Sequence, residues 1–276
     1  MPLVKKLVQT ALVCIAASTF AFSPLTAQDL KITYKTKVGA MLMSQKGTEV
    51  EYHSKHYKRT NDLNEKRDTL IDYRDFVSYE IDHKYKILRW TTLEYALKAK
   101  ELTATDLKEA MDADKDGKER EKLEKYLGKK TEASIKRTGT EVIAGRNCDK
   151  WEISAGKFTC KMSVDPSLVP PTPLDVLEKA AQLEFNDILA NPILGNMGKL
   201  FEAISKIKGI QLKSEIVMPI GPITIKMLRE ATAVTLGPIP DSAFELPKGY
   251  KEEDAGKKEL EELEKARKER QAKKKK

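Results

Sequence analysis

Apolar and polar residues alternate most clearly over residues 139–164, which read GTEVIAGRNCDKWEIS, AG and KFTCKMSV. Two runs with a period of two, separated by a short glycine-containing turn, predict a β-hairpin. The residues expected on its apolar face are Trp151, Ile153, Phe158, Cys160 and Met162. This pattern indicates an antiparallel sheet with one apolar side.

The turn of this hairpin sets the expected pairing of its two strands. A two-residue turn at Ala155-Gly156 places Ile153 opposite Phe158. In the same register, Trp151 lies opposite Cys160. Both apolar sets then share one face, so the turn and the alternation agree.

Further short runs rich in Val, Ile, Tyr and Trp predict a meander of strands. The expected strands are residues 29–38, 48–60, 69–74, 76–82 and 85–92 before the hairpin, and residues 209–218 and 222–236 after it. Consecutive strands usually pair with their neighbours, so one antiparallel sheet is expected. No internal repeat is apparent.

Helical patterns occur where the strand pattern stops. Residues 93–130 are charged and lack proline, and they suit two helices around an Asp-rich turn. After the rigid connector Pro170-Pro171-Thr172-Pro173, two amphipathic helices are predicted. Their apolar faces comprise Leu174, Leu177, Ala181, Phe185 and Ile188 in the first, and Met197, Leu200, Phe201, Ile204 and Ile207 in the second. Residues 251–276 are almost entirely charged and predict a frayed helix or a disordered tail.

The first residues have the layout of a secretory signal peptide. Lys5 and Lys6 precede an uncharged, largely apolar run, and cleavage is expected after Ala27 or, alternatively, after Ala21. The run is short for a membrane-spanning helix, so export is favoured over an uncleaved anchor. We therefore expect a protein of the periplasm, of the outer-membrane periphery or of the external medium.

The charge distribution argues against a nucleic-acid partner. The chain has 50 basic and 42 acidic residues and a formal charge of +8, part of which lies in the predicted signal peptide. Much of the remaining excess lies in the last dozen residues, so the folded body is close to neutral. That basic end is a solvated tail or a segment attracted to anionic lipid headgroups.

The cysteines outside the signal peptide are Cys148 and Cys160, in a compartment that permits disulfides. The expected register places them on opposite faces of the hairpin. A disulfide between them would therefore require a bulge near Arg146-Asn147 or a different register. The bridged and the free states both remain open.

Three segments resemble a bacterial family of exported proteins of unknown function, which is grouped with the periplasmic lipoprotein carriers of the LolA/LolB type. They are TGTEVIAGRNCDKWEIS, KMSVDPSL and IPDSAFELPKGY. The resemblance covers residues 31–250, whereas the charged insertion at 93–130 and the tail depart from it. It implies one α+β, mainly antiparallel domain over residues 28–250, built as a curved half-barrel whose concave face helices partly cover. In the carriers, that cavity holds acyl chains.

Two interpretations of the amphipathic helices follow. As core, they pack on the sheet and leave no void, which is the default for such helices. As a lid, they cover an apolar pocket for a ligand, as the resemblance implies. The pocket would then be lined by Trp151, Ile153, Phe158, Met162, Leu177, Phe201 and Ile204.

Asp112, Asp114 and Asp116, followed by Gly117, match the first half of a calcium-binding loop. The second half does not match, because Leu123 stands where a bidentate glutamate is required. An acidic, solvated turn between two helices explains the same residues. Calcium is the cofactor that this motif would imply.

Other candidate chemistry is sparse. His53 and His56 are three residues apart in an expected strand and so point to opposite faces, which disfavours a zinc site and suggests surface histidines. No nucleophile elbow, zinc-binding helix motif or phosphate loop is present in the sequence. We expect a non-catalytic protein that binds a lipid, an acylated protein or another apolar ligand. The alternatives are a calcium-binding or structural envelope protein, and a hydrolase that uses paired carboxylates.

Overall fold

The computed structural model describes residues 28–40, 43–113, 116–118, 121, 131–184, 195–220 and 222–274. The predicted signal peptide, residues 1–27, lies outside the described residues. Among the described helices, none combines the length and the apolar character needed to cross a membrane.

Twelve strands form one open sheet, in the order β12-β6-β5-β4-β3-β2-β1-β11-β10-β9-β8-β7. The strands are β1 (Leu30–Ala40), β2 (Met43–His53), β3 (Tyr57–Asp62), β4 (Arg67–Asp72), β5 (Val77–Asp82), β6 (Ile87–Thr92), β7 (Ser134–Ile143), β8 (Arg146–Ala155), β9 (Phe158–Asp165), β10 (Ile210–Ile220), β11 (Ile223–Leu236) and β12 (Lys251–Asp254). Short β12 runs parallel to β6, and the other neighbouring pairs are antiparallel.

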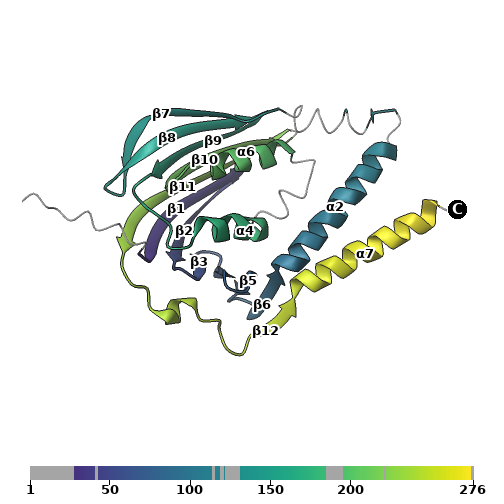
Figure 1. The fold of residues 1–276 in the computed structure, drawn as a ribbon, viewed down its shortest axis with the longest axis horizontal. Helices are drawn as coiled ribbons and strands as arrows, with labels where there is room; N and C mark the ends of the chain where they lie inside the picture. Colours follow the sequence, from purple (N-terminus) through teal and green to yellow (C-terminus); the bar gives the residue numbers. More distant parts are fainter. Residues whose placement is uncertain are drawn as a thin grey trace, which may run out of the picture.

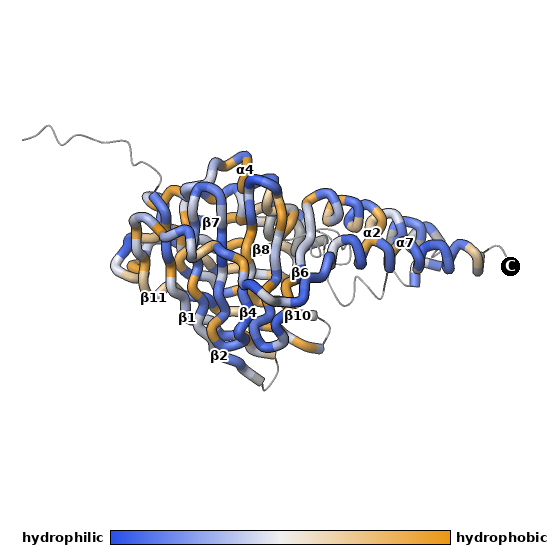
Figure 2. The backbone as a smooth tube through the Cα atoms, turned by 90° about the horizontal axis from the view of Figure 1, so that it is seen from below, coloured by the Kyte–Doolittle hydropathy of each residue, from blue (hydrophilic) through white to orange (hydrophobic). Residues whose placement is uncertain are grey.

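The sheet is curved, and two of the helices lie inside the curve (Figure 1). These are α4 (Leu174–Glu184) and α6 (Gly195–Ser205). Two further described helices, α2 (Leu93–Ala113) and α7 (Ala255–Lys274), project together from one end of the sheet as an arm (Figures 1 and 2). The predicted α+β half-barrel with helices on its concave face is therefore confirmed.

The predicted hairpin is formed by β8 and β9, but its turn differs from the one predicted. Gly156 and Lys157 make the turn, with Gly156 at a φ of +60°, so Ile153 pairs with Cys160 instead of Phe158. Trp151 likewise pairs with Met162. The predicted register is wrong by two residues, but a shift of two keeps every side chain on its face. The predicted apolar face is thus confirmed.

The predicted strand over residues 48–60 is wrong, because the chain turns in its middle. The Ser54 backbone N–H donates to the Tyr57 carbonyl at 2.8 Å, and the Ser54 Oγ accepts from the Tyr57 N–H at 3.1 Å. These bonds end β2 and start β3. The chain reverses there without a glycine or a proline, which is why the sequence pattern suggested one continuous strand.

The meander from β3 to β6 repeats one turn every ten residues. Each turn starts with an aspartate whose Oδ1 accepts a backbone N–H two residues later, at Asp62, Asp72 and Asp82. Each ends with a residue of positive φ, at Lys66, Phe76 and Lys86. The expectation of no internal repeat is therefore wrong. One aspartate per repeat is a weak signal, and Lys or Phe fills the position where glycine is usual.

The charged tail is ordered into β12 and α7, and α7 packs along α2. Arg270 Nη2 lies 2.5 Å from Asp106 Oδ2, and Arg267 Nη2 lies 3.3 Å from Glu109 Oε1. Of the two predicted states of this tail, the helix is the one observed. Its few apolar residues explain why packing against α2 could not be expected from periodicity.

Gly209 permits a close approach between the start of β10 and the end of β9. Its φ is +114°, and an added Cβ would lie 2.4 Å from the backbone oxygen of Asp165. At Gly237 the φ is +139°, but no atom lies within 4 Å of such a Cβ.

We expect Gly209→Ala to lower the free energy of unfolding by about 3 kcal/mol or more, because the methyl group adds a steric clash to backbone strain. Gly237→Ala introduces the strain alone and should cost about 1 kcal/mol. Urea unfolding of both variants measures the difference. Equal losses would contradict the close approach at Gly209.

Candidate functional site

Two apolar clusters on the concave face of the sheet each include residues of a described helix. The α6 cluster comprises Ile153, Ala155, Phe158, Cys160, Met162, Val164, Leu200, Ala203 and Met218, with Trp151 and Ile204 packed against it. The α4 cluster comprises Ile71, Tyr73, Leu93, Ala96, Ala180 and Leu183, with Phe76, Val176 and Leu177 packed against it. Each helix therefore covers its own part of the sheet.

The residues predicted to line one pocket are divided between these clusters. Ile153, Phe158 and Met162 are buried together beneath α6, with Phe158 fully inaccessible. Leu177 lies in the other cluster, beneath α4. The side chain of Phe201 lies outside the described residues. The sequence predicted the apolar face correctly but could not show that two helices would cover it separately.

A cavity of about 180 Å³ lies beneath α4. Six of its lining residues have apolar or aromatic side chains, namely Tyr73, Pro170, Leu177, Ala180, Ala181 and Ile210. The other two, His53 and Lys58, are polar and come from β2 and β3. An apolar wall with a localised polar end suits a ligand that has an apolar body and one polar terminus.

A second hollow, of about 310 Å³, lies where the end of α6 meets the edge of the sheet. Its apolar lining includes Trp151, Ile207 and Ile135. Lys206 and Lys208 stand at the same hollow. Trp151, which was expected in a pocket covered by helices, borders this hollow at the sheet edge and packs against the α6 cluster.

An ion-pair network lies on the concave face between the two clusters. Arg229 on β11 contacts two glutamates of β2, with Nη2 at 2.7 Å from Glu51 Oε1 and Nε at 2.8 Å from Glu49 Oε2. Its guanidinium also lies 3.5 Å from the ring centre of Tyr34. His53 Nε2 is 3.1 Å from Glu51 Oε2. Because His53 also lines the α4 cavity, the network forms part of the polar end of that cavity.

Burial and charge oppose each other at Glu51. Burial by itself would raise the pKa of this carboxyl, but Arg229, Lys58 and His53 outweigh it and hold the pKa well below the ordinary value of 4.5. Glu51 therefore stays ionised at neutral pH. The prediction that His53 is a surface histidine is wrong, because its side chain is only 14% exposed and contacts Glu51.

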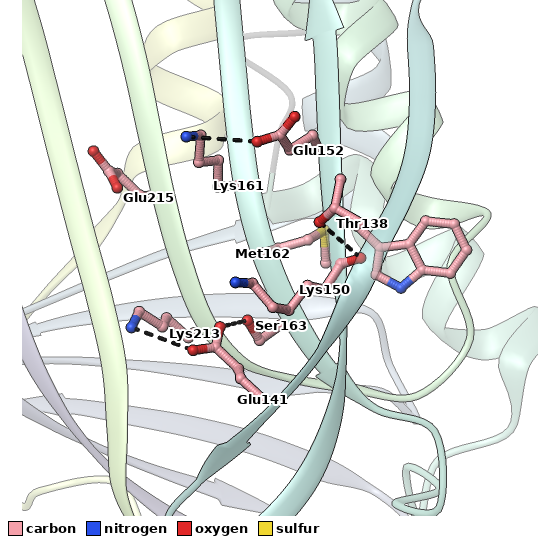
Figure 3. A pocket seen from close by; sticks show the side chains of 10 residues that line it. Thr138, Glu141, Lys150, Glu152, Lys161, Met162, Ser163, Lys213 and Glu215 are labelled. Atoms are coloured by element: carbon pink, nitrogen blue, oxygen red, sulfur yellow. Dashed lines mark hydrogen bonds and ion pairs between the residues drawn. The ribbon is translucent and has the colours of Figure 1, made fainter.

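The other face of the sheet carries a polar hollow of about 320 Å³ over β7 to β10 (Figure 3). Several of its polar and charged groups pair with one another. Lys161 lies 3.5 Å from Glu152, and Ser163 Oγ donates a short hydrogen bond to Glu141. Lys213 forms a hydrogen bond with Glu230 that raises the Lys213 pKa. Lys213 therefore stays protonated and cannot act as the base that would activate Ser163.

Cys148 and Cys160 are both buried and free. Cys148 belongs to a third cluster with Leu30 and Ile32, whereas Cys160 lies beneath α6. Of the two states left open by the sequence, the free one is observed. Burial raises the pKa of Cys148 to about 11 and that of Cys160 to about 12. Both thiols are therefore protonated and unreactive at neutral pH.

The Asp-rich loop is described only in part. Asp112 is exposed near the end of α2, and Asp116 is exposed and lies 2.9 Å from Lys118. Asp114 lies outside the described residues. Within the described part of the chain, no three His, Cys, Asp or Glu residues gather as metal ligands would. Calcium binding at this loop stays a prediction.

The family described as "Domain of unknown function (DUF4412)" matches residues 78–250. The chain belongs to this family. The matched region contains α2, α4, α6, β6 to β11 and all of β5 except Val77, so it includes Arg229 and most of the α4 cavity. Glu51, His53 and Lys58 precede it. A comparison with curated proteins finds no match.

Several solved structures match this chain at low sequence identity and low TM-score. PNGF-II matches at 15% identity and a TM-score of 0.38, over 86% of this chain and 33% of its own, so this chain spans about a third of that protein. An uncharacterised conserved protein from Thermus thermophilus matches at 6% identity and a TM-score of 0.41, over 83% of this chain and 91% of its own. A putative outer membrane lipoprotein-sorting protein domain from Vibrio parahaemolyticus matches at 7% identity and a TM-score of 0.30, over 79% of this chain and 89% of its own. At these values the likeness assigns no ligand and no activity.

Arg229→Leu should lower the free energy of unfolding by about 3 kcal/mol at pH 7, because it leaves Glu51 buried without its main partner. The low pKa of Glu51 stabilises the folded protein at pH values above the Glu51 pKa of the unfolded chain, near 4.5. This stabilisation is lost as the pH falls toward the Glu51 pKa of the folded protein. The deficit of the variant should therefore shrink below pH 4.5.

The control is Arg89→Leu, which removes two more exposed ion pairs, with Glu80 and with Glu253, and should cost about 1 kcal/mol or less. Urea unfolding at a series of pH values compares the two. A deficit for Arg229→Leu that does not change with pH would contradict the assignment to Glu51.

Proposed function

We propose that this protein is a non-catalytic binding protein that holds an acyl chain, carried by a lipid or by an acylated protein, in the cavity beneath α4. The observation that supports this proposal is the lining of that cavity, which is apolar apart from His53 and Lys58. A ligand there would bury its chain against Leu177 and Tyr73. A carboxylate or phosphate at its end would suit His53 and Lys58.

The size of the cavity limits the kind of ligand. Pockets that enclose a whole drug-sized ligand measure roughly 300–1,000 Å³, and this one is about 180 Å³. It therefore takes the end of one chain rather than a whole diacyl lipid. Each buried methylene contributes about 0.8 kcal/mol. The burial of a short apolar segment therefore supplies a modest binding free energy, which offsets part of the cost of association. Modest affinity suits a carrier that must release its ligand.

The predicted signal peptide is consistent with this role, because an exported protein of this kind meets lipids and acylated proteins of the cell envelope. Export itself stays a prediction. The family of unknown function gives no competing assignment.

Leu177→Asp should weaken binding of a fluorescent fatty acid about tenfold or more, because it places a carboxylate in the apolar wall. Binding is measured by fluorescence titration, and native mass spectrometry shows whether the purified protein carries lipid. Leu174→Asp is the matched control. Leu174 lies on the same helix but is 61% exposed, so this variant should bind as the unaltered protein does.

Equal binding by all three proteins would place the ligand elsewhere. An unaltered protein that neither carries lipid nor binds the probe would contradict the proposal.

A further inference from the structure

The sheet ends at β7, and the outer side of this strand has no partner among the described strands. β7 has ten residues, eight of which are exposed. Two of these are large apolar residues, Ile135 at 40% and Val142 at 65% exposure. A long edge strand with exposed apolar side chains is a template for pairing with another strand.

A bulge in β7 changes which residues share a face. Arg137 pairs with Trp151 and Gly139 pairs with Lys150, so Thr138 is the extra residue. Before the bulge, Ile135 and Arg137 lie on the concave side, opposite Ile153 and Trp151. The residues that lie on that side after the bulge are Thr140 and Val142, opposite Asp149 and Asn147.

This bulge makes the strand complementary to itself. When two copies of β7 run antiparallel about a two-fold axis between Thr138 and Gly139, Ile135 faces Val142 of the other copy. In the same register, Lys136 faces Glu141. In an antiparallel pair, two residues that face each other lie on the same side of the sheet. In a strand without a bulge, residues placed symmetrically about an axis between two neighbouring residues lie on opposite sides, so such a strand could not pair with its own copy in this register. The extra residue, Thr138, brings the facing residues of β7 to the same side.

We propose that β7 is a self-association edge, through which two copies of this chain form a two-fold dimer with one continuous sheet. Each copy contributes the same patch, so every contact occurs twice. Two Lys136–Glu141 pairs lie on the outer side. Two Ile135–Val142 pairs lie on the concave side, and Ile135 also lines the hollow that contains Trp151 and Ile207. Opposite charges and apolar pairs directly across two strands both stabilise pairing.

Charge reversal tests this register. Lys136→Glu places two glutamates opposite each other twice, and Glu141→Lys does the same with lysines. Each variant alone should dimerise about tenfold or more weakly than the unaltered protein in analytical ultracentrifugation. A mixture of the two variants should associate, because the glutamates of one variant then face the lysines of the other in both pairs.

Two controls separate association from folding. Lys150→Glu reverses an exposed charge one strand away from the edge and should leave the dimer unchanged. Urea unfolding of each monomeric variant shows that it is folded, which is needed for Glu141→Lys because Glu141 also contacts Lys213.

A protein that stays monomeric at its highest soluble concentration overturns the proposal. A dimer that both reversals leave intact overturns it as well. Association in the mixture, together with its loss in each single variant, is the result that supports the assigned register.

Discussion

Two short helices must cover the concave face of a sheet much wider than they are. α4 and α6 have 11 residues each, which makes each about 16 Å long. Twelve strands at about 4.8 Å spacing span roughly 50 Å. The described helices therefore cover the sheet in two places. Between them, β1 and β11 carry a third apolar cluster that includes Leu30, Ile32 and Ala231. The Arg229–Glu51 ion pair lies beside this cluster, with the Arg229 guanidinium against the ring of its member Tyr34.

This network also gives the α4 cavity its polar end. His53 and Lys58 both interact electrostatically with Glu51, and both line the cavity. The charge of the polar end is thus set by the same carboxylate that Arg229 holds ionised. A ligand that brings a negative group to His53 and Lys58 competes with Glu51 for them. The ionised Glu51 therefore lowers the affinity of this end of the cavity for an anion.

Local sequence patterns predicted the parts of this structure that depend on alternation. The apolar face of the β8–β9 hairpin was correct even with the wrong turn, because a two-residue shift preserves the side of every residue. Patterns of this kind could not predict contacts between distant residues. Arg229 and Glu51 are far apart in the chain, and His53 lies in a polar strand that looks exposed. The α4 cavity was predicted through Leu177 alone for the same reason, since its polar residues come from β2 and β3.

The two edges of the sheet differ in a way that bears on association. At one edge, β12 has four residues and leads directly into α7, which packs along α2 and extends away from the sheet (Figure 1). That edge is short, and short edges are poor templates. At the other, β7 is long and carries a bulge, a feature that usually twists an edge away from new partners. In the proposed dimer the bulge lies at the two-fold axis, so Lys136 of one copy faces Glu141 of the other, and Ile135 faces Val142. The same feature that would exclude a regular foreign strand therefore favours a second copy of β7.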